Sequence, residues 1–152
     1  MPPLNTPLWG LPDPLDQPEF YADVPIKRGV AWVIDVILIS LMVGILVLVT
    51  AGIGLFFIGF LYILVGFSYR VLSLAGGSAT LGMHLVAIEL RRHDGTRFDM
   101  GIAILHTLGY MLSTSFVLPQ LASIALMLTT PRGQGLTDMV LGTAAINRSA
   151  RF

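Results

Sequence analysis

Four charged residues lie in or beside strongly apolar segments, where a charge needs a physical reason. Asp35 and Arg70 lie within apolar segments, Arg28 precedes the first of them, and Asp138 follows the last. An isolated charge near the centre of a membrane helix costs about 2.5–3.5 kcal/mol on insertion scales. Asp35 must therefore be paired, hydrated or protonated. It is either a proton- or cation-binding carboxylate, or half of a structural ion pair that fixes helix packing.

Helix geometry groups these four residues into pairs. A helical hairpin folded at residues 51–52 places Asp35 and Arg70 within roughly 3 Å of each other along the two axes. Helical side chains lean toward the N-terminus of their own helix, so these two lean toward the same depth. Arg28, seven residues before Asp35 on the same face, leans away from it. Asp138 is the only acidic residue beyond the third apolar segment. We therefore predict that Arg28 lies close to Asp138, and Asp35 close to Arg70 or to another polar group at equal depth.

Other combinations of reactive residues are weak. The chain has no cysteine, which excludes disulfides and thiolate chemistry. His84, Glu89 and His93 match no compact metal-binding motif. His106, within an apolar segment, is better explained as a hydrogen-bonded packing histidine than as a proton relay. The sequence has no nucleophile elbow and no phosphate-binding loop. We expect no enzymatic activity, no catalytic residue, no metal site and no cofactor.

Composition indicates that lipid is the main solvent of this chain. Of its 152 residues, 55% are hydrophobic and 12% are charged, whereas soluble domains carry roughly 25% charged residues. The net charge is zero and there is no basic block, which argues against nucleic-acid binding. The sequence therefore predicts an all-α integral membrane protein that contacts the lipid bilayer.

Proline and acidic residues mark the N-terminal segment as different from the rest. Residues 1–25 hold seven of the nine prolines and four acidic residues, but no basic residue. Since proline disfavours helix and sheet, we predict a disordered tail over 1–25. Residues 26–148 then form the transmembrane domain, and 149–152 a short C-terminal tail.

Two transmembrane helices follow from the first apolar stretch. Between Gly29 and Tyr69 the only charge is Asp35, and one span needs about 20 apolar residues. We predict helices at about 30–49 and 55–74, joined by a tight turn at 50–54. Small residues recur every seven positions in this region and predict a helix-packing stripe. The stripe consists of Gly52, Gly59, Gly66 and Ser73.

The remaining segments are less regular. Residues 80–97 contain a turn signal at 93–96, which predicts a short interfacial β-hairpin, with an amphipathic helix as the alternative. Residues 100–131 lack acidic residues, lysine and arginine, and at ~48 Å they are too long for one untilted span. Pro119 predicts that this third hydrophobic segment is one kinked helix or two short ones. A short amphipathic piece is expected at 136–146.

Basic residues predict the orientation in the membrane. They flank the predicted hairpin at one end only, at Lys27, Arg28, Arg70, Arg91, Arg92 and Arg97. The positive-inside rule then places the N-terminus in the cytoplasm. Arg132, Arg148 and Arg151 favour a cytoplasmic C-terminus as well, with residues 100–131 folding back. A single third span would place those three arginines outside.

Four motifs, in order, resemble the RDD family, which is named for one arginine and two aspartates. The opening motif is Arg28, a small residue at Ala31, and Asp35. Residues 77–82 resemble the family's linker motif, and residues 86–95 resemble the turn that follows it in the family. Residues 134–143 resemble the family's closing motif, in which an aspartate, here Asp138, is followed by Gly-Thr. The resemblance covers about 26–148, although Met83 and His84 stand where the family usually has basic residues.

This resemblance implies a membrane family with few spans and several roles. Some members resemble monovalent cation–proton antiporters, and others accompany unrelated domains as accessory modules. We therefore expect a multi-pass protein of the bacterial inner membrane that carries protons, monovalent cations or small solutes as a homo-oligomer. The alternative is an accessory or assembly subunit of a larger membrane complex.

Overall fold

The computed structural model describes residues 10–148, and two long antiparallel helices form its frame. These are α1 (Val24–Val49) and α2 (Ile58–Gly77), joined through the 3-10 turn η2 (Ile53–Phe57). Both are long and apolar enough to cross a membrane. The predicted hairpin is thus confirmed, with α1 starting six residues earlier and α2 ending three residues later than expected. Gly52, at φ 86°, supplies the left-handed turn.

The predicted small-residue stripe is not one continuous contact within the chain. A Cβ at residue 66 would make ordinary van der Waals contact with Ile39 on α1 and Met111 on α4, so this position faces neighbouring helices without requiring glycine. Gly59 faces open space, and Gly52 belongs to the turn rather than to a helix face. The seven-residue spacing breaks down because η2, and not α2, contains the first turn after residue 52.

The third hydrophobic segment is broken, as predicted. It forms α4 (Met100–Ser115) and α5 (Val117–Thr129), bent by 116°. The break lies at Phe116, which has extended backbone angles, rather than at Pro119. Pro119 instead lies in the first turn of α5, where the absence of an N–H costs no hydrogen bond.

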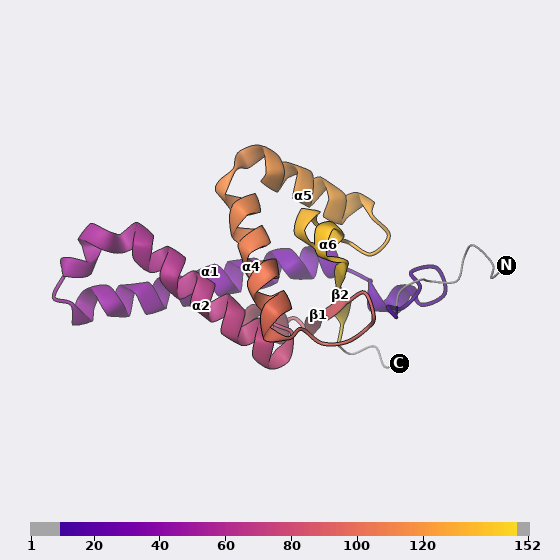
Figure 1. Cartoon of the computed structure of the whole chain (residues 1–152), viewed down its shortest axis with the longest axis horizontal. Helices are drawn as coiled ribbons and strands as arrows, with labels where there is room; N and C mark the ends of the chain where they lie inside the picture. The colour runs from indigo at the N-terminus through magenta and orange to yellow at the C-terminus, as the bar shows by residue number, and fades with distance from the viewer. Residues whose placement is uncertain (1–9, 149–152) are drawn as a thin grey trace.

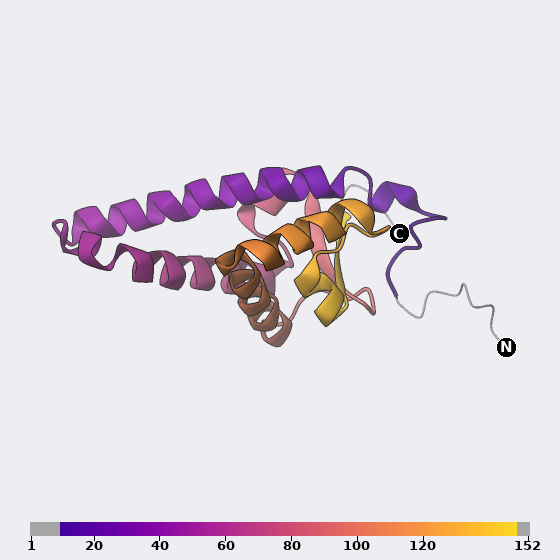
Figure 2. The same ribbon diagram turned by 90° about the horizontal axis from the view of Figure 1, so that it is seen from above.

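Both ends of this bent pair lie at the same end of the α1–α2 hairpin. Before α4, the Phe98 N–H donates to Ser78 Oγ at the end of α2, at 2.5 Å. After α5, the Gly133 carbonyl accepts from Arg28 Nη1 near the start of α1, at 3.4 Å. The α4–α5 pair therefore leaves that end and returns to it, while the tip of the hairpin projects alone (Figures 1 and 2).

A two-stranded antiparallel sheet replaces the predicted local β-hairpin. Strand β1 (Ile88–Arg92) follows the short helix α3 (Leu81–Leu85) and pairs with β2 (Thr143–Asn147) in the register Leu90 to Ala145. The prediction of a strand was right, but its partner lies near the C-terminus. The piece expected at 136–146 divides at Gly142 into α6 (Leu136–Leu141) and β2, because Gly142 adopts φ 66° and ends the helix.

Residues 10–23 pack against this sheet, which corrects the prediction of a disordered tail for that part. Leu11 and Phe20 are buried in a cluster with Ala144 and Ile146 of β2. The Tyr21 hydroxyl donates to the Pro12 carbonyl at 2.7 Å. The 3-10 turn η1 (Pro18–Phe20) joins this segment to α1. Proline composition misled the prediction because the interspersed apolar side chains bury enough surface to order the segment. Residues 1–9 and 149–152 of the predicted tails lie outside the described residues.

Candidate functional site

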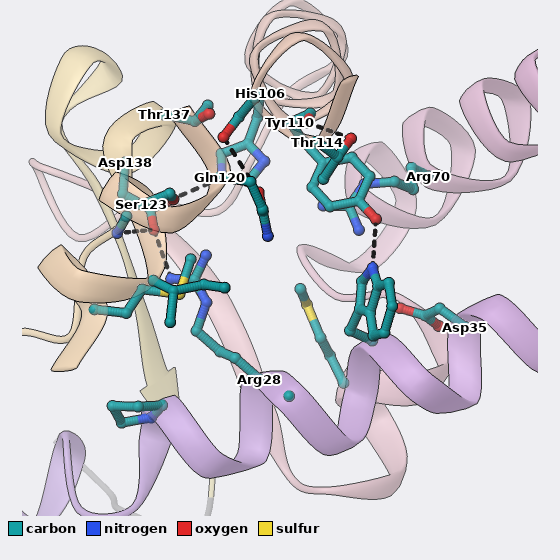
Figure 3. Close-up of a pocket in the computed structure, with 18 of the residues that line it drawn as sticks. Arg28, Asp35, Arg70, His106, Tyr110, Thr114, Gln120, Ser123, Thr137 and Asp138 are labelled. Atoms are coloured by element: carbon teal, nitrogen blue, oxygen red, sulfur yellow. Dashed lines mark hydrogen bonds and ion pairs between the residues drawn. The ribbon is translucent and has the colours of Figure 1, made fainter. Parts of the chain in front are cut away.

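The first pair predicted from sequence is formed by the start of α1 and by α6. Arg28 Nη1 lies 2.5 Å from Asp138 Oδ2, and the Asp138 side chain is fully buried. The same carboxylate accepts hydrogen bonds from His106 Nε2 at 2.9 Å, Thr143 Oγ1 at 2.7 Å and the Gly135 N–H at 3.1 Å. The prediction that Arg28 lies beside Asp138 is thus confirmed. Figure 3 shows the two side chains approaching from opposite walls of a cavity.

Local structure explains why Asp138 holds this position and stays ionised. It occupies the first turn of α6, where its carboxylate accepts from the Gly135 N–H and so caps its own helix. Burial by itself raises the pKa of Asp138. The Arg28 guanidinium and the hydrogen bonds from His106 and Thr143 outweigh burial and hold this pKa below its ordinary range.

Asp35, the second aspartate, is buried at 4% exposure and is held by neutral donors. Its Oδ1 accepts from the Tyr69 hydroxyl at 2.6 Å and the Gly82 N–H at 2.9 Å. Its Oδ2 accepts from Thr80 Oγ1 at 2.6 Å. A Cβ at residue 82 would overlap the Ala31 carbonyl oxygen and the Asp35 carboxylate, so only glycine permits this approach. Asp35 therefore joins α1, α2 and the start of α3.

Asp35 and Arg70 do not form the predicted ion pair. The alternative, a polar group at equal depth, is what the structure contains, because Tyr69 precedes Arg70 on α2 and its hydroxyl reaches Asp35. Arg70 instead stacks on Tyr110 of α4, with its guanidinium carbon 3.8 Å from the ring centroid. The Tyr110 hydroxyl in turn accepts from Trp32 Nε1 at 2.8 Å. Axial distance along two helices predicted the depth of these groups but not their direction around each helix axis.

All four predicted residues line one cavity of about 520 Å³. The cavity lies between α1 on one side and α4, α5 and α6 on the other (Figure 3). Its apolar wall includes Ile124, Met127 and Leu128 of α5. A second cavity of about 650 Å³ shares Arg70, Tyr110 and Thr114 with the first. The Arg70–Tyr110 stack therefore lies where the two cavities meet.

Several residues of this site were missed by the sequence analysis. Thr80, Gly82, Tyr69 and Thr143 are hydrogen-bond donors to the two aspartates. A signal for Thr80 existed, since a threonine before a short helix is a common N-cap, and its hydroxyl does accept from the Met83 N–H. His106 is hydrogen-bonded, as expected, and its partner is Asp138.

A metal site finds no support in the part of the chain that the structure describes. No group of three or more histidine and acidic side chains among residues 10–148 could hold a metal ion. The cavity is lined by four charged side chains, Arg28, Asp35, Arg70 and Asp138, together with a set of neutral donors.

Comparison with known proteins identifies the family of this chain. The model of the RDD family matches residues 23–142, a range that holds Arg28, Asp35 and Asp138. Searches of curated proteins and of solved structures gave no significant match. Since the family match covers most of the chain and the residues of the site, the chain belongs to the RDD family.

Proposed function

We propose that this RDD-family protein is a multi-pass protein of the bacterial inner membrane, with α1 and α2 crossing the bilayer. Large apolar side chains are exposed along the projecting half of the hairpin, and such a surface requires lipid or a partner. They include Leu41, Ile45, Leu48, Val49, Phe56 and Phe60. The return of α4–α5 to the same end of the hairpin supports a re-entrant pair rather than a third span. The arginines at that end support a cytoplasmic location for both termini.

In this proposal the protein carries a small solute through the cavity between α1 and the α4–α5 pair. The observation that carries it is that Arg28, Asp35, Arg70 and Asp138 line one cavity of about 520 Å³. Ligand sites are typically concave and mostly apolar with a few placed polar groups, in the range of about 300–1,000 Å³. Two spans and one re-entrant pair enclose no complete path across a bilayer, so the carrier is a homo-oligomer.

Hydrogen bonding favours a small solute over a bare proton or monovalent cation. Both oxygens of Asp35 already accept from neutral donors, and both oxygens of Asp138 accept as well. A cation bound to either carboxylate would have to compete with these donors. Cation–proton exchange at Asp35 is tested separately. Proton movement on addition of sodium or potassium is measured in proteoliposomes that contain the wild-type protein or the Asp35→Asn variant. Equal proton movement in the two would exclude exchange at Asp35.

Access to the cavity from both sides of the membrane is the decisive test of a carrier. Because the chain has no cysteine, single cysteines report without background. Gln120→Cys places a thiol on the cavity wall, while Asp16→Cys and Ile53→Cys mark the two ends of the hairpin. We expect a membrane-impermeant thiol reagent to modify Gln120→Cys in both right-side-out and inverted vesicles. Each marker cysteine should react in only one of them. Modification of Gln120→Cys from one side alone would contradict a carrier.

A second role, as an accessory subunit of a larger membrane complex, is favoured by the surface of α5. Val117, Leu118 and Leu121 are exposed next to the break at Phe116 and could be covered by a helix of another protein. Purification from the native membrane in mild detergent separates the two roles. A stoichiometric larger partner that is lost in a Leu118→Ser variant supports the accessory role, and a homo-oligomer without such a partner supports the carrier.

A further inference from the structure

Arg70 is a buried cation that donates no hydrogen bond to any of the described residues 10–148. The side chain is 6% exposed, and its Nε atom has no hydrogen-bond partner. Arg70 forms no ion pair with any of residues 10–148. A guanidinium carries five N–H donors, and buried donors without acceptors are unfavourable. The free protein therefore leaves a positive group of the cavity unsatisfied.

The stack on Tyr110 explains how Arg70 is positioned for a ligand. Its guanidinium carbon lies 3.8 Å from the ring centroid, so the aromatic ring covers one flat face of the group. Hydrogen bonds of a guanidinium lie in its plane, and stacking leaves the edge free. That edge matches the two oxygens of a phosphate or a carboxylate. Trp32 Nε1 donates to the Tyr110 hydroxyl and so holds the ring in place.

The two carboxylates of the cavity do not satisfy this need. Asp35 accepts from Tyr69, Thr80 and the Gly82 N–H. Asp138 is paired with Arg28 and accepts three further hydrogen bonds. Each carboxylate oxygen thus already accepts at least one hydrogen bond, whereas the Arg70 donors lack acceptors, which points to an anionic rather than a cationic ligand.

Gln120 provides a second donor from the opposite wall. Its Oε1 accepts from Ser113 Oγ at 3.3 Å, which leaves the amide nitrogen for another partner. Figure 3 shows the nitrogen end of Gln120 pointing into the middle of the cavity, between His106 and Arg70. The next turns of α5 present Ile124, Met127 and Leu128 to the same cavity. Polar donors and an apolar wall therefore lie side by side.

We propose that the solute of this cavity carries an oxyanion, a phosphate or a carboxylate, bound by Arg70 and Gln120, with its apolar part against α5. The inference rests on the proposed function in one respect only, that this cavity is the solute site. The oxyanion can belong to an amphiphile taken from the lipid phase or to a free anion taken from water. The experiment has one arm for each source.

Trp32 makes binding observable, since it lines the cavity. The full-length chain with Trp9→Phe, purified in an uncharged maltoside detergent, has Trp32 as its single tryptophan. Its fluorescence is titrated with dodecyl phosphate, with inorganic phosphate and with dodecyltrimethylammonium. We expect saturable binding of dodecyl phosphate at least about tenfold tighter than of the cationic probe, because a hydrogen-bonded charge pair forms with only one of them. Saturable binding of inorganic phosphate as well would assign the free anion as the source, and its absence would assign the amphiphile.

Variants assign the preference to Arg70. Arg70→Gln should reduce the ratio of anionic to cationic affinity by about tenfold or more. Arg70→Lys should give an intermediate ratio, because the charge remains but the planar pair of donors is lost. Arg97→Gln, which removes an exposed arginine outside the cavity, should leave the ratio unchanged. The ratio is insensitive to a general loss of folded protein, and the wild-type comparison stands even if Arg70→Gln does not fold.

The outcomes separate this inference from the proposed function. Equal or tighter saturable binding of the cationic probe would overturn the anion preference and leave the cavity as a solute site. No saturable binding of any probe would overturn the inference together with the cavity as a solute site. An unchanged ratio in folded Arg70→Gln would remove Arg70 from the recognition of the anion and overturn the proposal.

Discussion

Arg28 Nη1 lies 2.5 Å from Asp138 Oδ2, although 110 residues separate the two along the chain. The pair joins the first turns of α1 to α6, and α6 continues directly into β2. Through β2 it also positions the N-terminal segment, because Asn147 Nδ2 donates to the carbonyls of Glu19 and Ala22. One ion pair therefore connects both ends of the described chain to the wall of the cavity.

The stability lost on removing both members of this pair should be smaller than the sum of the losses in the two single variants. Asp138→Asn leaves Arg28 without its carboxylate and also weakens the acceptors for His106 and Thr143. Breaking a buried pair in this way costs about 3–5 kcal/mol. The double variant Arg28→Gln, Asp138→Asn should be less destabilised than the sum of the single variants. Thermal unfolding in detergent measures all four proteins, and strict additivity would show that the two residues are not coupled.

The stabilisation supplied by Asp138 should disappear only in acid. Its pKa in the folded protein lies below its ordinary range because Arg28, His106 and Thr143 favour the carboxylate. A lowered pKa adds stability that is complete above the unfolded value, about 3.9, and is lost as the pH falls toward the folded pKa. The difference in unfolding temperature between wild type and Asp138→Asn should thus be constant from pH 8 to pH 5 and shrink below about pH 4. A difference that already shrinks between pH 7 and pH 5 would contradict the lowered pKa.

Gly82→Ala should be strongly destabilising, and Gly76→Ala should not. A Cβ at residue 82 meets the Ala31 carbonyl oxygen and the Asp35 carboxylate, which are parts of packed α1. Overpacking of this kind costs about 1–3 kcal/mol. A Cβ at residue 76 has nothing within 4 Å, so alanine there should be neutral or stabilise α2 by up to about 1 kcal/mol. Unfolding of the two variants in detergent is the measurement, and equal stability would show that α3 can move away from α1 without cost.

The two ends of the hairpin should be accessible from opposite sides of the membrane, with α3 to β1 on the same side as the N-terminal segment. Asp16→Cys and Thr96→Cys should react with an impermeant thiol reagent only in inverted vesicles. Ile53→Cys, at the hairpin turn, should react only in right-side-out ones. Reaction of Thr96→Cys together with Ile53→Cys from one side would contradict α2 as a membrane span and the proposed orientation.

Local patterns predicted the helices of this fold well, because apolar length and charge position act within one segment. The hairpin of α1 and α2 and the break between α4 and α5 were both predictable. The pairing of β1 with β2 was not, because alternating residues at 88–92 indicate a strand without specifying its partner. The order of residues 10–23 was also missed, since the side chains that bury Leu11 and Phe20 come from the other end of the chain.

Some contacts of the candidate site could likewise be predicted from sequence, and others could not. Arg28 was predicted to lie beside Asp138 because it leans away from Asp35 and because Asp138 is the only acidic residue after the third hydrophobic segment. The partners of Asp35 depend on where the turn after α2 directs Thr80 and the Gly82 N–H, and helix periodicity carries no such information. The stack of Arg70 on Tyr110 depends in turn on how α4 packs against α2, a contact between distant segments that helix periodicity does not specify.

The projection of the hairpin tip beyond all other elements has a consequence for the surrounding lipid (Figures 1 and 2). With α1 and α2 across the bilayer, one leaflet contains two helices, while the other must also accommodate α4, α5 and the elements packed around them. A molecule with such unequal cross-sections is wedge-shaped. The elastic energy of the bilayer around it is lowest where the two leaflets differ in area. Neighbouring copies of the protein would therefore attract or repel one another through the curvature that each imposes on the membrane.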